Sequence, residues 1–204
     1  LCRDWSSDVC SSDLKITGIE GELRFEGAGM VVEASRGTIL GAQLSRTRAE
    51  IPDFDAHVAQ LKVKGLAEGP TSEFLRFIEQ SPVGERIDHF TADMSAQGDG
   101  RLDIALHIPL DSDHLGESKV NGSYHFLNNE LIVDQGLPPL RQVNGNLQFS
   151  EKDLRIPEAN ATLLGGPVKI KGGTLSDGRV VIGATGSVNI AQLRRQVDQP
   201  VFDN

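Results

Sequence analysis

The stretch GRLDIALHIPL, residues 100–110, decides the fold class because its apolar and polar positions alternate. Leu102, Ile104, Leu106 and Ile108 fall on one face of an extended chain, and the residues between them fall on the other. A period of two is the signature of a β-strand whose two faces meet different surroundings. Pro109 marks the end of the strand or the edge of a sheet.

A repeated pattern extends this reading along the chain. Three segments share the order Gly-x-φ-x-Phe-x4-φ-x-φ, where φ is apolar, and each predicts a β-hairpin of two period-2 strands. They are GELRFEGAGMVV (21–32), GSYHFLNNELIV (122–133) and GNLQFSEKDLRI (145–156), with predicted turns at 27–29, 128–129 and 151–153. A fourth hairpin is predicted for TLSDGRVVIG (174–183), with Asp177-Gly178 in its turn. Repeated hairpins that bury no face alone must stack into an extended β array.

One stretch interrupts the β pattern. TSEFLRFIEQSP (71–82) has a capping residue at Thr71 or Ser72, an apolar side and a terminating proline. These signals predict a short amphipathic helix near residues 72–80. NIAQLRRQV (189–197) is a weaker second helix candidate.

The first 14 residues are expected to be an artefact. DWSSDVCSSDL (4–14) equals, residue for residue, the translation of a common sequencing adapter, so we exclude it from fold reasoning and expect it to be disordered. It contains Cys10 and Trp5, and Cys2 precedes it, so the remaining chain has no cysteine and no tryptophan. The two cysteines could form a local disulfide, but neither is expected to have a role. The parent protein is expected to be longer at its start.

Composition argues against several functions. The formal net charge is −9 and the chain has no Lys/Arg cluster, which argues against nucleic-acid binding. The five histidines are scattered without metal-ligand spacing, and the acidic segment DSDHLGES (111–118) lacks the pattern of a calcium loop. The glycine pairs in LGGP (164–167) and KGG (171–173) do not precede a helix, so they indicate turns or bulges. We expect no enzyme, no metal and no cofactor.

The apolar faces of the strands need a partner. They can pack on one another in a closed β-sandwich, or line an open, curved sheet that forms a groove for an apolar ligand. No long helix that could cover them is predicted. The residue pattern alone favours the sandwich.

A resemblance changes this balance. IPDFDAHVAQLKVKGLAEGPTSEFLRFIEQSPV (51–83), LDIALHIPLD (102–111), VNGSYHFLNNELIV…GLPPLRQVNGNLQFSEKDLRI (120–156) and ATLLGGP (161–167) together resemble the YhdP family of AsmA-like envelope proteins. The resemblance covers residues 15–204. It implies a mainly β fold, an elongated curved antiparallel sheet of repeated hairpins with an open apolar groove. The chain would then be one segment of that groove.

The resemblance also implies a function. The family implies a Gram-negative periplasmic protein, anchored in the inner membrane by an N-terminal helix, that moves phospholipid between the inner and outer membranes. Its partners would be phospholipid acyl chains, the inner membrane and other envelope proteins, and it supplies no catalytic residue. The alternative is a non-catalytic structural or assembly module of the envelope. The expected groove-lining residues are those on the apolar strand faces: Leu23, Phe25, Val32, Leu102, Ile104, Leu106, Ile108, Phe126, Leu131, Val133, Leu147, Phe149, Leu154 and Ile156.

Overall fold

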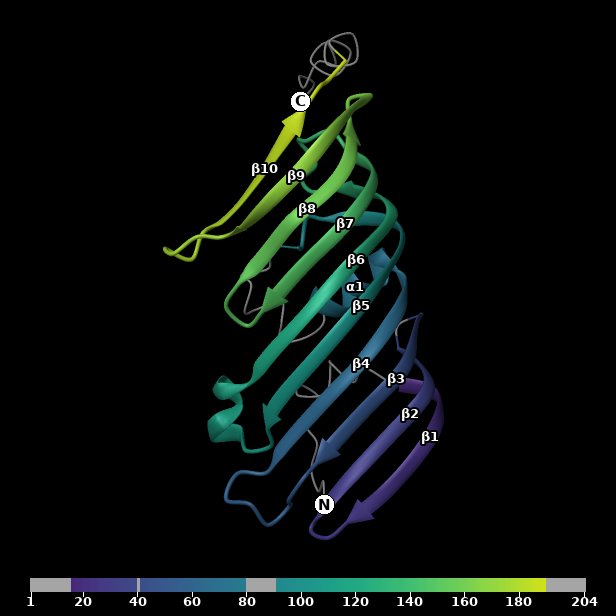
Figure 1. Cartoon of the computed structure of the whole chain (residues 1–204), viewed down its shortest axis with the longest axis vertical. Coiled ribbons are helices and arrows are strands. Elements are labelled where there is room, and N and C mark those ends of the chain that lie inside the picture. Colours follow the sequence, from purple (N-terminus) through teal and green to yellow (C-terminus); the bar gives the residue numbers. More distant parts are fainter. Residues whose placement is uncertain (1–15, 40, 80–90, 190–204) are drawn as a thin grey trace, which may run out of the picture.

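The computed structural model describes residues 16–39, 41–79 and 91–189. These residues form a single antiparallel sheet in which the ten strands follow one another in chain order from β1 to β10. The long axis of the molecule crosses the strands, with β1 at one end and β10 at the other (Figure 1). The elements are β1 (Ile16–Glu26), β2 (Gly29–Ile39), β3 (Ala42–Ile51), β4 (Gln60–Pro70), α1 (Thr71–Glu79), β5 (Ser95–Pro109), η1 (Ser112–Glu117), β6 (Lys119–Ile132), β7 (Leu140–Ser150), β8 (Leu154–Leu163), β9 (Gly166–Thr174) and β10 (Val180–Gly186).

The expectation of an open sheet is confirmed, and the alternative of a closed β-sandwich is wrong. Within the described ranges β1 pairs only with β2 and β10 only with β9, so the sheet has two edges and no second layer of strands. The local alternation of apolar and polar residues is the same in both architectures, which is why the residue pattern alone favoured the wrong one.

Most of the predicted elements are confirmed. The helix expected near residues 72–80 is α1, and the hairpins with turns at 27–28, 151–153 and 175–179 are β1–β2, β7–β8 and β9–β10. LGGP contributes Leu164 and Gly165, both at positive φ, to the β8–β9 turn. The first 14 residues and the predicted helix after Asn189 lie outside the described residues.

The prediction of a hairpin at residues 122–133 is wrong. This segment runs through β6 as one strand as far as Ile132, and Asn128 and Asn129 form a bulge rather than a turn. Asn128 adopts the left-handed region at φ 56°, which asparagine tolerates better than most residues. The extra residue keeps Phe126 and Leu131 on one face, so a bulged strand satisfies the same sequence pattern as a hairpin.

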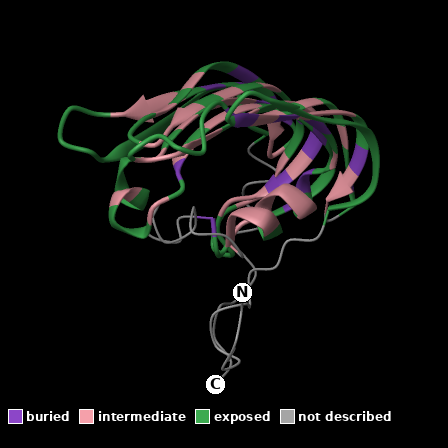
Figure 2. Ribbon diagram, turned by 90° about the horizontal axis from the view of Figure 1, so that it is seen from below, coloured by how far each residue is buried: buried purple, intermediate pink, exposed green. Residues whose placement is uncertain are grey.

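Further bulges accompany the curvature of the sheet. Gly18 in β1, Arg46 in β3 and Gln142 in β7 also have positive φ, and each lies at a shift in strand register. A bulge bends its strand and increases its twist. Figure 2 shows the resulting arch, with α1 beneath it and η1 at the opposite side.

Helix α1 is held under the arch by a buried polar contact and by aromatic rings. The Thr71 hydroxyl oxygen accepts hydrogen bonds from the Tyr124 hydroxyl at 2.8 Å and from Asn129 Nδ2 at 2.6 Å. Phe74 packs edge-on against Tyr124, with ring centroids 5.1 Å apart. Thr71 and Asn129 are 2% and 0% exposed, and Asn129 also donates to Gln97 O and accepts from the Leu127 N–H, so the buried polar groups are all hydrogen-bonded.

Glycines on the same face make room for rings from the next strand. A Cβ atom at Gly100 would overlap the Tyr124 ring, and one at Gly122 would overlap the Phe149 ring. The two aromatic side chains therefore lie flat across a neighbouring strand instead of standing up from the sheet. The apolar face is therefore flatter than it would be with upright rings.

Replacing Thr71 by Val should lower the free energy of unfolding by about 1–3 kcal/mol, because the buried Tyr124 hydroxyl loses its acceptor and Asn129 Nδ2 loses one of its two acceptors. Denaturant unfolding of the purified chain measures it. Ser72→Val, at the adjacent exposed helix position, is the control and should change the free energy by less than about 0.5 kcal/mol. Equal costs for the two variants would contradict the inferred role of Thr71.

Tyr124 should titrate at unusually high pH. Burial, aided by the charge of Asp99, raises the pKa of its hydroxyl to about 12. Tyr124 is the chain's only tyrosine, so tyrosinate absorbance reports it alone. The midpoint should fall to about 10 in denaturant. Since the folded-state pKa is the higher one, its stabilising contribution is complete below pH 10 and is lost as the pH rises toward 12. A native midpoint near 10 would contradict the buried hydroxyl.

Gly122→Ala should destabilise the fold by about 1–3 kcal/mol, because the new methyl group displaces the Phe149 ring. In a Phe149→Ala background the same change should cost less than about 0.5 kcal/mol, which a double-mutant cycle of unfolding free energies measures. Gly116→Ala, where a Cβ atom meets nothing within 4 Å, is the neutral control. Additive costs at residues 122 and 149 would refute the ring-over-glycine arrangement.

Candidate functional site

The candidate site is the face of the sheet that α1 lies against, which we call the inner face. Residues paired across antiparallel strands point to the same side, so strand register defines rows of side chains that cross the sheet. One row crosses β1 to β6 and contains Leu23, Val32, Ala49, Val63, Leu106 and Val120. A second crosses β2 to β7 with Gly37, Leu44, Ala67, Leu102, Tyr124 and Leu147.

A third row carries the inner face to the far edge. It crosses β4 to β10 and contains Gly69, Gly100, Phe126, Gly145, Ala159, Ile170 and Ala184. None of the three rows contains a charged residue, and together they cover all ten strands. At about 4.8 Å between strands, this uncharged strip is about 43 Å long.

The opposite, outer face has a different chemistry. The corresponding row through β1 to β7 contains Glu22, Glu33, Arg48, Lys64, Ala105, Asn121 and Ser150. Glu33 pairs with both Arg24 and Arg48, and Arg48 also pairs with Glu50 at 2.8 Å. The hydrogen bond from Arg48, and then the charge of Arg24, lower the pKa of Glu33. The sheet therefore separates a polar, solvated surface from an apolar one.

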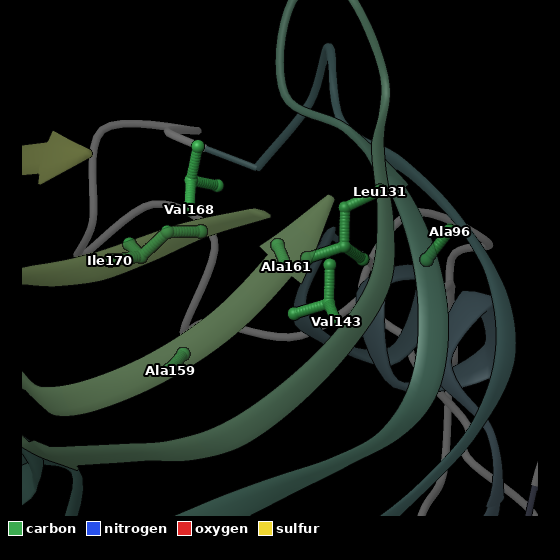
Figure 3. Close-up of a cluster of buried hydrophobic side chains, with 7 residues drawn as sticks. All are labelled: Ala96, Leu131, Val143, Ala159, Ala161, Val168 and Ile170. Carbon is green, nitrogen blue, oxygen red and sulfur yellow. The ribbon is translucent and has the colours of Figure 1, made fainter. Parts of the chain in front are cut away.

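The burial of the inner face changes along the strands. We call the strand ends nearest α1 the α1 side and the ends nearest η1 the η1 side. On the α1 side of β5 to β9 the apolar residues form the buried cluster drawn in Figure 3: Ala96, Leu131, Val143, Ala159, Ala161, Val168 and Ile170. Leu75 of α1 packs against this cluster. On the η1 side of β4 to β8 the inner-face residues are only half-buried: Leu61, Val63, Leu106, Ile108, Val120, Phe149 and Leu154.

The residues expected to line a groove lie largely together. Register places Leu23, Phe25, Val32, Leu102, Ile104, Leu106, Ile108, Phe126, Leu131, Leu147, Phe149, Leu154 and Ile156 on the inner face. Val133 is the exception, because β6 ends at Ile132 and Val133 lies in the bend that follows. Leu131 is 6% exposed and belongs to the buried cluster.

Sequence reasoning missed the inner-face residues of β3, β4, β9 and β10. In QLKVKGLAEG (60–69) the period-2 signal is present at Leu61, Val63 and Ala67, but Gly65 interrupts the apolar series. Gly65 lies in the same row as Ile104, Gly122, Phe149 and Leu154, so it continues the inner face without a side chain. If Gly65 is accepted as an inner-face position, the alternation runs unbroken from Leu61 to Ala67 and predicts this strand.

Groups suited to catalysis do not converge in the described part of the chain. His107 and His125 lie on the outer face, and DSDHLGES forms η1 with its flanking residues. Among the described residues no three His, Cys, Asp or Glu side chains are placed to hold a metal ion. A shallow cavity of about 290 Å³ lies near the β3–β4 loop, lined by Pro52, Asp53, Ala56, Gln60, Lys62 and His107, and it is separate from the three rows.

Comparison with known proteins identifies the family. No curated protein and no solved structure matches the chain. Among the described residues no helix is long and apolar enough to cross a membrane. The model of the family described as YhdP protein matches residues 14–204, which is nearly the whole chain. This chain therefore belongs to the YhdP protein family.

Proposed function

We propose that the chain is a segment of a periplasmic protein that conducts phospholipid between the inner and outer membranes along the inner face of its sheet. The observation that carries the proposal is an inner face whose three rows hold no charged residue and whose η1 side is only half-buried in β4 to β8, backed by a charged outer face. The full-length protein would be anchored in the inner membrane by a helix outside this segment, as the family resemblance implies.

The energetics explain why such a strip is useful. A phospholipid that crosses water exposes roughly 30 methylene groups at about 0.8 kcal/mol each, on the order of 25 kcal/mol. An apolar trough shields the acyl chains, while the charged headgroup stays in water and keeps its hydration. Most of the cost of leaving a membrane is thereby removed without any chemical step.

Conduction also needs a surface without a deep binding site, because a lipid held tightly at one place would block the path. The three inner-face rows are built almost entirely from Leu, Val, Ile, Ala, Gly and Phe. The buried polar side chains of Thr71 and Asn129 are hydrogen-bonded, and Thr47 of β3 is a polar but uncharged inner-face residue beside Gly65. This even composition suits movement of a lipid better than its storage.

The orientation of adjacent residues on β7 provides the test. Phe149 is paired with Gly122 and Leu154 on the inner face, and its neighbour Gln148 is exposed on the outer face. Benzoylphenylalanine introduced at residue 149 of the full-length protein in cells should form an adduct with phospholipid upon irradiation. The same probe at residue 148 should form at least tenfold less, as measured by mass spectrometry of the purified protein. Equal adduct formation at both positions, or none at residue 149, would refute the proposal.

A further inference from the structure

The inner face is not uniformly available to a ligand, because its burial changes from one end of the strands to the other. On the α1 side Ala67, Tyr124 and Val143 are 5%, 6% and 2% exposed. On the η1 side, Val63 of β4, Leu106 of β5 and Val120 of β6 are half-buried. The strands are continuous, so the difference comes from what packs on the face.

The α1 side is occupied by the protein itself. Thr71, at the start of α1, is tied to Tyr124 and Asn129 by two hydrogen bonds between buried groups. Leu75 packs against the buried cluster around Leu131 and Val143. A ligand entering here would have to break these contacts and leave buried polar groups unsatisfied, which is costly. From β4 to β9, α1 and the buried cluster therefore close one border of the half-buried apolar surface as a wall.

The opposite border is open to water. The strands end on the η1 side in loops 52–59 and 110–118 and in the turn 151–153, most of whose residues are exposed. A charged headgroup pays a large desolvation cost in an apolar setting. The three inner-face rows offer it no charged partner, so it must lie along the η1 side.

The width of the free surface matches one lipid tail. From Leu102, beside the wall, to Ile108, at the end of β5, the strand extends over about 20 Å. A bilayer with a hydrocarbon core of about 30 Å contains two layers of tails, so one tail occupies about 15 Å. A tail laid parallel to the strands fits between the open border and the wall.

We infer that phospholipid tails lie parallel to the strands, with the headgroup at the η1 side and the tail ends directed at α1. This inference rests on the proposed function and adds an orientation to it. The helix then sets the depth of the trough and, with it, the tail length that fits. Tyr124, Phe74 and Leu102 lie where the tail ends arrive, and loops 110–118 and 151–153 lie beside the headgroups.

Two photoreactive lipids test the orientation in the full-length protein. One is phosphatidylethanolamine with a diazirine at the end of a 16-carbon tail, and the other carries the diazirine on its headgroup. After exchange from vesicles and irradiation, peptide mass spectrometry locates the labels. The tail-end probe should label the peptides of Leu102, Tyr124 and α1, and the headgroup probe should label loops 110–118 and 151–153, each with at least fivefold preference.

A shorter tail gives the matched control. With a diazirine at the end of an eight-carbon tail, the label should move away from α1 toward Leu106 and Val120, because the tail reaches about half as far. Labels that ignore tail length, or tail-end labels concentrated in loops 110–118, would overturn the orientation while leaving lipid conduction intact. Absence of any inner-face label with all three probes would instead overturn the proposed function, and the orientation with it.

Discussion

The structure depends on the coupling between strand register and side-chain direction. Residues opposite one another in antiparallel strands point to the same side of the sheet. An apolar residue in one strand therefore contributes to an apolar face only if its partner in the next strand is also apolar. A shift of one residue in β5 would place Arg101 and Asp103 in the rows that now hold Leu102 and Ile104. The separation of the two faces over ten strands is therefore a property of nine pairings held in register, and not of any single strand.

The bulges reconcile this requirement with curvature. A bulge adds one residue to a strand. In a regular strand, one added residue would turn every later side chain to the opposite face of the sheet. In β6 the extra residue at Asn128 allows both Phe126 and Leu131 to lie on the inner face. An extra residue at Gln142 in β7 restores the pairing between the two strands. The sheet bends on the α1 side without mixing charged and apolar residues. The bend also brings the ends of β5 to β9 together, which allows a cluster of mostly small side chains to become dry.

The elements predicted correctly from the sequence are those that short stretches of residues determine. Alternation identified β5, turn residues identified three hairpins, and capping with an amphipathic pattern identified α1. Sequence reasoning failed at residues 122–133, because a hairpin and a bulged strand obey the same apolar spacing. It did not separate an open sheet from a sandwich, since closure depends on distant strands. It also did not show that Leu131 is enclosed and Phe149 is accessible, because that difference arises from the packing of α1 and from the bent strand ends, which alternation does not report.

The Phe149 ring, which lies flat over Gly122 on the η1 side, affects how easily a molecule could slide along the inner face. A molecule that slides across the strands meets a ridge at each one, about 4.8 Å apart, and its mobility falls exponentially with the height of those ridges. An upright aromatic side chain at this position would obstruct such a molecule. Because the Phe149 ring lies over Gly122, it does not stand up as an obstacle to the lipid movement proposed above. Under the proposed function, a flat apolar surface of this kind would favour neither direction of movement.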